Sequence, residues 1–79
     1  MMEEDYRNVS CGGDPFNFLM STIKSIQLDI KLSDYVKVMI MEDKFPYTDK
    51  IFEKIANYYK LNFVSIERVN NEIHLILEK

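Results

Sequence analysis

Tryptophan is absent from this chain of 79 residues, which contains one cysteine, two glycines and two prolines. The single cysteine, Cys11, cannot form an internal disulfide, and it excludes a zinc site built from several cysteines. So few glycines and prolines favour regular helices and strands joined by short connections. No apolar run approaches the length of a membrane-spanning helix, so no membrane partner is expected. A free thiol fits a reducing cytoplasm.

Positive charge is also limited, since ten lysines and arginines face 13 aspartates and glutamates for a net charge of −3. A nucleic-acid-binding domain of this size would usually carry a basic face, so no nucleic-acid partner is expected. The only histidine, His74, lies on a predicted strand and is interpreted as a surface imidazole. Neither a metal site nor a cofactor is predicted. The 47% hydrophobic content is that of a folded domain.

Apolar residues recur at helical spacing in two segments. The first helix is predicted over residues 15–27, and the second begins near Thr48 or Asp49 and is closed by Lys60. The apolar stripe of the first helix consists of Phe16, Leu19, Met20, Ile23 and Ile26. That of the second consists of Ile51, Phe52, Ile55, Ala56 and Tyr59. Each stripe is expected to pack against a sheet.

Alternating apolar residues predict strands at 35–41, 63–69 and 72–78. Asn70-Asn71 joins the last two strands, and asparagine tolerates the positive φ angles of a two-residue hairpin turn. A short edge strand is also predicted within residues 5–10, from Tyr6 and Val9. Residues 28–34 are open to three interpretations: a continued helix, an extended connection or a brief strand.

The predicted order is therefore β-α-β-α-β-β in a single domain over residues 1–79. Two helices with one apolar face each must cover the same face of one sheet. The fold class is α/β (α+β), a two-layer sandwich with both helices on one face of a four-stranded mixed sheet. The uncovered face is of mixed polarity and is open to a partner protein; it carries Lys37, Met39, Met41, His74 and Ile76.

The candidate site is Cys11-Gly12-Gly13-Asp14-Pro15, directly before the first helix. Asp14 can cap the helix, and Pro15 suits its first position. Gly12 and Gly13 leave little side-chain cover around the thiol. A helix N-terminus favours the thiolate of Cys11, whereas the nearby Asp14 carboxylate opposes it. The alternative interpretation is a glycine-rich loop with an incidental small apolar residue.

In this element order, the chain resembles the TusA/SirA-like sulfur-carrier (sulfurtransferase) family. Residues 36–43, Pro46 and residues 49–51 resemble the family's strand, acidic-proline turn and helix start, and residues 61–79 resemble its final hairpin. The family motif Cys-Pro-x-Pro corresponds to the degenerate sequence of residues 11–15, in which the first proline is missing. The resemblance implies that Cys11 accepts persulfide sulfur and relays it to a partner protein.

Two functions are therefore weighed. In the first, the chain is a sulfur carrier with Cys11 as acceptor and Gly12, Gly13, Asp14 and Pro15 in support. In the second, it is a non-catalytic TusA-like interaction or dimerisation module without sulfur transfer. Such a module would dock a partner or a second copy through the mixed sheet face or the Tyr58-Tyr59 edge. RNA binding is a weaker third hypothesis because the chain is acidic.

Overall fold

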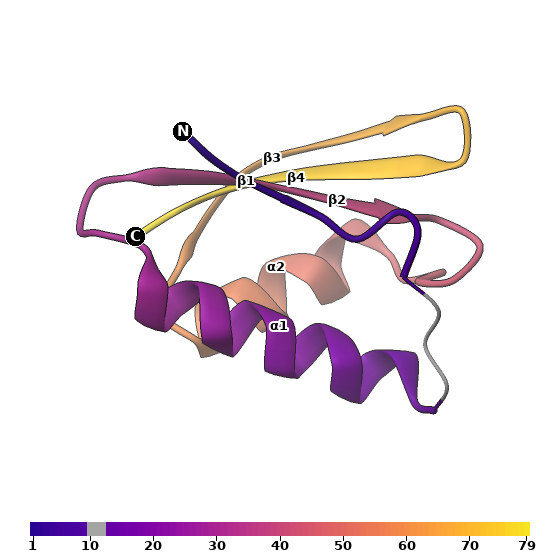
Figure 1. Cartoon of the computed structure of the whole chain (residues 1–79), viewed down its shortest axis with the longest axis horizontal. Helices are drawn as coiled ribbons and strands as arrows, with labels where there is room; N and C mark the ends of the chain where they lie inside the picture. Colours follow the sequence, from indigo (N-terminus) through magenta and orange to yellow (C-terminus); the bar gives the residue numbers. More distant parts are fainter. Residues whose placement is uncertain (10–12) are drawn as a thin grey trace.

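Four strands form one mixed sheet, and both helices lie on the same side of it (Figure 1). The structure is a computed structural model that describes residues 1–9 and 13–79. In chain order the elements are β1 (Met2–Asp5), α1 (Pro15–Asp29), β2 (Tyr35–Met41), α2 (Asp49–Tyr58), β3 (Asn62–Val69) and β4 (Glu72–Glu78). The predicted α+β fold class and element order are confirmed.

The strand order within the sheet is β1-β2-β4-β3. β1 pairs in parallel with β2, and β4 pairs antiparallel with both β2 and β3. β4 therefore occupies the middle of the sheet next to β2, although it follows every other strand in the chain. β1 and β3 are the two edge strands.

The core lies between the sheet and the two helices. Its sheet side consists of alternate residues of β2 and β4, each at most 2% exposed: Val36, Val38, Ile40, Ile73, Leu75 and Leu77. Its helix side includes Leu19, Ile23, Ile26, Phe52, Ile55 and Ala56. The two periodicities in the sequence thus predicted most of the buried positions, although Phe16 of the first stripe is 38% exposed and Met39 of the other sheet face is buried. Phe45, in the loop after β2, is also completely buried.

The ambiguous stretch after residue 27 begins as helix. α1 continues to Asp29, two residues beyond its predicted end, and the Ile30 N–H donates to the Ile26 carbonyl at 2.8 Å. Ile30 is buried, whereas Leu28 and Leu32 are 71% and 81% exposed. The alternation that suggested a strand therefore reflects one inward residue between two solvent-facing leucines.

The prediction of an edge strand within residues 5–10 was wrong in its position. β1 covers Met2–Asp5, and its register places Glu3 opposite Lys37 of β2. The weak alternation in 5–10 came from Tyr6, whose N–H donates to the Met39 carbonyl at 2.8 Å just after β1 ends. An edge strand with one solvated face tolerates acidic residues such as Glu3 and Asp5.

The second helix is capped at both ends. The Thr48 Oγ1 accepts from the Ile51 N–H at 3.4 Å, so Thr48 is the N-cap of α2. The helix ends at Tyr58, earlier than predicted, because Lys60 adopts a left-handed conformation with φ 62°. The Leu61 N–H donates to the Ala56 carbonyl at 2.9 Å, which completes a Schellman motif with lysine where glycine is usual.

The hairpin turn is confirmed. Asn70 and Asn71 have φ of 52° and 65°, as a type I′ turn requires. β3 starts at Asn62, and its pairing with β4 is irregular between Phe63 and Ser65. Neither helix in the described part of the chain has the length and apolar character that crossing a bilayer requires.

Candidate functional site

The structure brings the described part of the predicted site to the start of α1 (Figure 1). Cys11 and Gly12 lie outside the described residues. Gly13 and Asp14 are exposed, and a Cβ placed on Gly13 would meet no atom within 4 Å. The approach to the helix start is therefore open on the side of Gly13.

Asp14 is the N-cap of α1, as predicted. Its backbone is extended, with φ −80° and ψ 111°, and its Oδ1 accepts from the Phe16 N–H at 2.9 Å. Pro15 occupies the first position of the helix, where its missing N–H would have no intrahelical partner. Asp14 thus satisfies one of the free amides at this helix end, where the helix dipole is positive.

Two contacts attach the flanks of this segment to the loop between β2 and α2. On the N-terminal side, the Lys44 Nζ donates to the Val9 carbonyl at 3.0 Å. On the C-terminal side, the Phe16 and Tyr47 rings meet edge to face with their centroids 5.7 Å apart. The loop that carries Lys44 and Tyr47 therefore contacts the residues on both sides of the candidate site.

A second set of aromatic contacts lies toward the core. The Phe18 ring lies 5.9 Å from the Tyr6 ring and 6.0 Å from the Phe45 ring, measured between centroids. These contacts join α1, the end of β1 and the loop after β2. The start of α1 is thus positioned by aromatic packing on two neighbouring segments, the end of β1 and the loop after β2.

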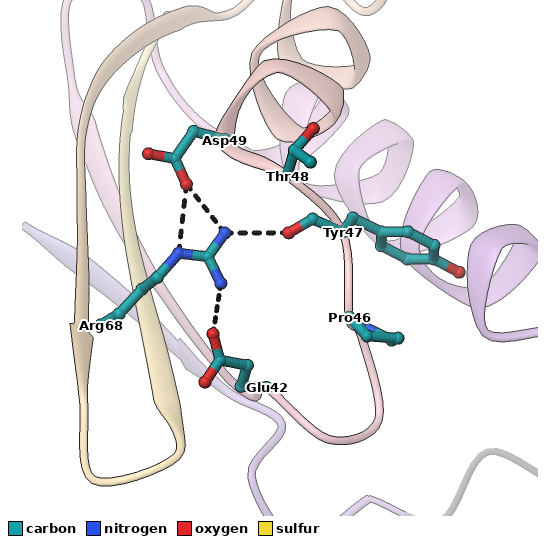
Figure 2. A pocket seen from close by; sticks show the side chains of 6 residues that line it. All are labelled: Glu42, Pro46, Tyr47, Thr48, Asp49 and Arg68. Atoms are coloured by element: carbon teal, nitrogen blue, oxygen red, sulfur yellow. Dashed lines mark hydrogen bonds and ion pairs between the residues drawn. The ribbon is translucent and has the colours of Figure 1, made fainter.

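A groove of about 610 Å³ opens beside the N-terminus of α2, and we call it the Arg68 groove (Figure 2). It is lined by Glu42, Pro46, Tyr47, Thr48, Asp49 and Arg68. Figure 2 shows the Arg68 guanidinium pointing from β3 toward the loop that leads into α2. Tyr47 belongs both to this groove and to the contact with Phe16.

Arg68 is surrounded by acceptors. Its Nη1 donates to a Glu42 carboxylate oxygen at 2.6 Å, and its Nε and Nη2 donate to Asp49 Oδ1 at 3.1 and 2.8 Å. Its Nη2 also donates to the Tyr47 carbonyl at 2.8 Å. Hydrogen bonding to Asp49 raises the pKa of Arg68. Since two carboxylates neutralise this cation, it clamps the hairpin to the α2 start and is poorly suited to bind an anion.

The open face of the sheet carries a chain of four interacting ionisable side chains. Arg7 donates to Asp5 through Nε and Nη2 at 2.9 and 2.8 Å, and its Nη1 lies 3.3 Å from Glu72 Oε1. The His74 Nε2 lies 2.8 Å from the same Glu72 oxygen. The hydrogen bond with His74 lowers the pKa of Glu72. His74 is therefore a surface partner of Glu72, in line with its predicted place on the outward face.

The ion pair with Arg7 changes the pKa of Asp5, and this effect can be tested by titration. Hydrogen bonds from Arg7 lower the pKa of Asp5 from 3.8 to about 2. Because the folded pKa is the lower one, the pair stabilises the fold above about pH 4, and this contribution is lost as the pH falls toward 2. An NMR titration of the Asp5 carboxyl should show the low pKa, and Arg7→Gln should return it toward 3.8. Arg68→Gln is the matched control; an equal shift in both variants would contradict the pairing.

Sequence reasoning missed the residues that surround the site. Lys44 and Arg68 were assigned no role, because each acts on a segment distant in the chain. The aromatic Phe16 was assigned to the core stripe, yet it is 38% exposed and contacts Tyr47. Only the pairing of an acidic helix start with an arginine on a later strand could have suggested the Arg68 clamp.

A second, smaller groove of about 280 Å³ lies where the two helices end, and we call it the helix-end groove. It is lined by Lys24, Gln27, Leu28, Tyr58, Tyr59 and Lys60. The Tyr58 and Tyr59 rings meet edge to face at 4.9 Å. The structure thus places the Tyr58-Tyr59 edge, which the sequence had singled out, at the wall of a groove.

Comparison with known proteins identifies no relative. No family model matches the chain, and no curated protein or solved structure matches it significantly. Within residues 1–9 and 13–79, no group of three histidine, cysteine, aspartate or glutamate side chains could hold a metal ion. Any functional conclusion therefore depends on the residues and geometry described above.

Proposed function

We propose that this protein is a small sulfur carrier that accepts persulfide sulfur on Cys11 and relays it to a partner protein in the cytoplasm. The observation that carries the proposal is the start of α1. Asp14 caps the helix, and Gly13 beside it is open to solvent. Cys11 precedes this helix start by only a few residues. The resemblance to TusA/SirA-like sulfur carriers adds support from the sequence.

The proposed transfer balances without an external oxidant or reductant. The Cys11 thiolate attacks the terminal sulfur of a donor persulfide, and a new sulfur–sulfur bond forms on Cys11. The sulfur–sulfur bond of the donor breaks, and the donor leaves as a thiolate. The proton of the terminal sulfur remains on that sulfur. In the second step an acceptor thiolate attacks the same terminal sulfur and releases the Cys11 thiolate.

The exposed start of α1 supports proteins as the sulfur donor and acceptor in preference to a small substrate. The helix start is exposed at Gly13 and Asp14, which gives another protein's cysteine room to approach. Lys44 contacts Val9 and Tyr47 contacts Phe16, so a partner would meet positioned residues on either side of the candidate site. A positioned helix end also favours a thiolate over a thiol.

The proposal is tested by mass spectrometry after incubation with glutathione persulfide. We expect the mass of one additional sulfur atom on the protein, none on Cys11→Ser, and loss of the adduct when an acceptor thiol is added. The Cys11 thiol pKa should lie well below the free value of about 8.5. Asp14→Asn keeps the cap and removes a nearby negative charge, so it should lower the thiol pKa further.

A peptide of residues 8–15 provides the control for ordinary thiol reactivity. The folded protein should form the adduct faster than the peptide at neutral pH, because only the protein has the helix. Equal rates, together with a thiol pKa at or above about 8.5, would contradict sulfur transfer.

The second candidate function is a TusA-like interaction module without sulfur transfer. The observation that favours it is the exposure of two large apolar side chains at the helix-end groove, with Leu28 71% and Tyr58 66% exposed. An alkylating reagent that fails to modify Cys11, combined with a partner or a second copy bound elsewhere, would favour this function over sulfur transfer. Rapid alkylation at neutral pH would favour the carrier.

A further inference from the structure

The helix-end groove differs in charge from the rest of the chain. Its only charged lining residues are Lys24 and Lys60, both exposed, although the chain as a whole has a net charge of −3. Asp29 is near in sequence, but it does not line the groove. A positive groove on an acidic protein favours an anionic ligand.

Backbone carbonyls at the C-terminal ends of both helices already have hydrogen-bond donors. The Gln27 carbonyl, in the last turn of α1, accepts from the Lys79 Nζ at 2.8 Å. The Asn57 carbonyl at the end of α2 accepts from the Lys60 N–H at 3.0 Å. Because these carbonyls already have donors, the ammonium groups of Lys24 and Lys60 are not needed to satisfy them.

The groove also presents apolar surface. Leu28 and Tyr58 are among the most exposed large hydrophobic side chains of the described residues. The volume of about 280 Å³ is below the roughly 300–1,000 Å³ of sites for drug-sized ligands. The groove has room for one inserted aliphatic side chain.

From these observations we propose that the helix-end groove binds an acidic segment of a partner protein that inserts one aliphatic side chain. The aliphatic side chain would contact Leu28 and the two tyrosines, and flanking carboxylates would reach Lys24 and Lys60. This inference extends the interaction-module function and does not depend on sulfur transfer. The groove lies near the C-terminal end of α1, about 20 Å along the helix from its first residue, Pro15.

The test uses fluorescence anisotropy with a labelled peptide in which two glutamates flank a central leucine on each side. Binding to the full chain is expected, and it should weaken when salt rises from about 0.05 M to about 0.5 M. A peptide with glutamines in place of the glutamates and one with alanine in place of the leucine should each bind more weakly. Lys24→Gln should weaken binding about fivefold, the upper range for an exposed ion pair.

Lys50→Gln is the matched control, because Lys50 is an exposed lysine in the first turn of α2 and does not line the groove. Leu32→Ala is the matched control for Leu28→Ala, since Leu32 is equally solvent-facing and also outside the groove. We expect both controls and Cys11→Ser to bind like the parent protein, whereas Leu28→Ala weakens binding.

Several results would overturn the proposal. The first is absence of peptide binding, and the second is equal loss in Lys24→Gln and Lys50→Gln. A Leu28-dependent dimer in sedimentation experiments would assign the groove to a second copy of this chain. Tighter, Lys24-dependent binding of single-stranded RNA would assign it to nucleic acid. Loss of peptide binding in Cys11→Ser would place the binding site at the other end of α1, while leaving sulfur transfer to its own test.

Discussion

Phe45→Ala is expected to lower the free energy of unfolding by about 3–5 kcal/mol, the usual range for truncating a buried phenylalanine. The Phe45 side chain is completely buried and packs beside Phe18. The loss comes from the apolar surface no longer buried and from the cavity left behind. Urea unfolding followed by circular dichroism measures it.

Phe16→Ala is the matched control. Because Phe16 is 38% exposed, its truncation should lower the free energy of unfolding far less. A domain of this size has a free energy of unfolding of roughly 4–12 kcal/mol, so Phe45→Ala could leave it partly unfolded. Phe45→Leu therefore serves as a second, milder variant with a smaller loss. Similar losses for the truncations of Phe45 and Phe16 would contradict the placement of Phe45 in the core.

Replacing Asn70 and Asn71 together by alanine is expected to lower the free energy of unfolding by about 2–4 kcal/mol, because alanine pays roughly 1–2 kcal/mol for each left-handed residue. Both asparagines have positive φ, and the turn carries a further contact: the Asn71 carbonyl accepts from the Glu42 N–H at 2.8 Å. The turn therefore connects the hairpin to the end of β2. Thermal and urea unfolding of the double variant would measure the loss.

Asn71→Gly provides the control for this prediction. Glycine adopts positive φ without a steric cost, and asparagine followed by glycine is a preferred type I′ pair. The variant should therefore be about as stable as the parent protein. A loss equal to that of the alanine variant would show that the Asn71 side chain matters for another reason than backbone conformation.

Most of the fold could be predicted because its core strands and helices have clear periodicity. Val36, Val38 and Ile40 alternate along β2, and the stripes of both helices face the sheet. The prediction was wrong where a segment is held in place by contacts with a neighbouring segment and not by its own apolar pattern. β1 has little apolar character of its own, and it is held in the sheet by parallel pairing with β2. Lys60 ends α2 in a conformation that its residue type does not signal.

The candidate site was predictable only in its local part. Asp14 and Pro15 are recognisable as a helix start because capping depends on adjacent residues. The hydrogen bond from Lys44 to Val9 joins residues that are 35 positions apart in the chain, and local sequence patterns do not indicate such a contact. The helix-end groove likewise forms only when two helices end side by side, as the Leu28 and Tyr58 positions show.

The place of β4 has a consequence for how the chain folds during synthesis on the ribosome. This strand is made after the other three, yet it separates β2 from β3 in the sheet. Until β4 leaves the exit tunnel, β3 has no neighbour, and β2 can pair only with the short β1. The helices then have no complete apolar surface to cover. Folding of this domain therefore waits for its final strand to emerge, and a nascent chain that lacks β4 would depend on chaperones.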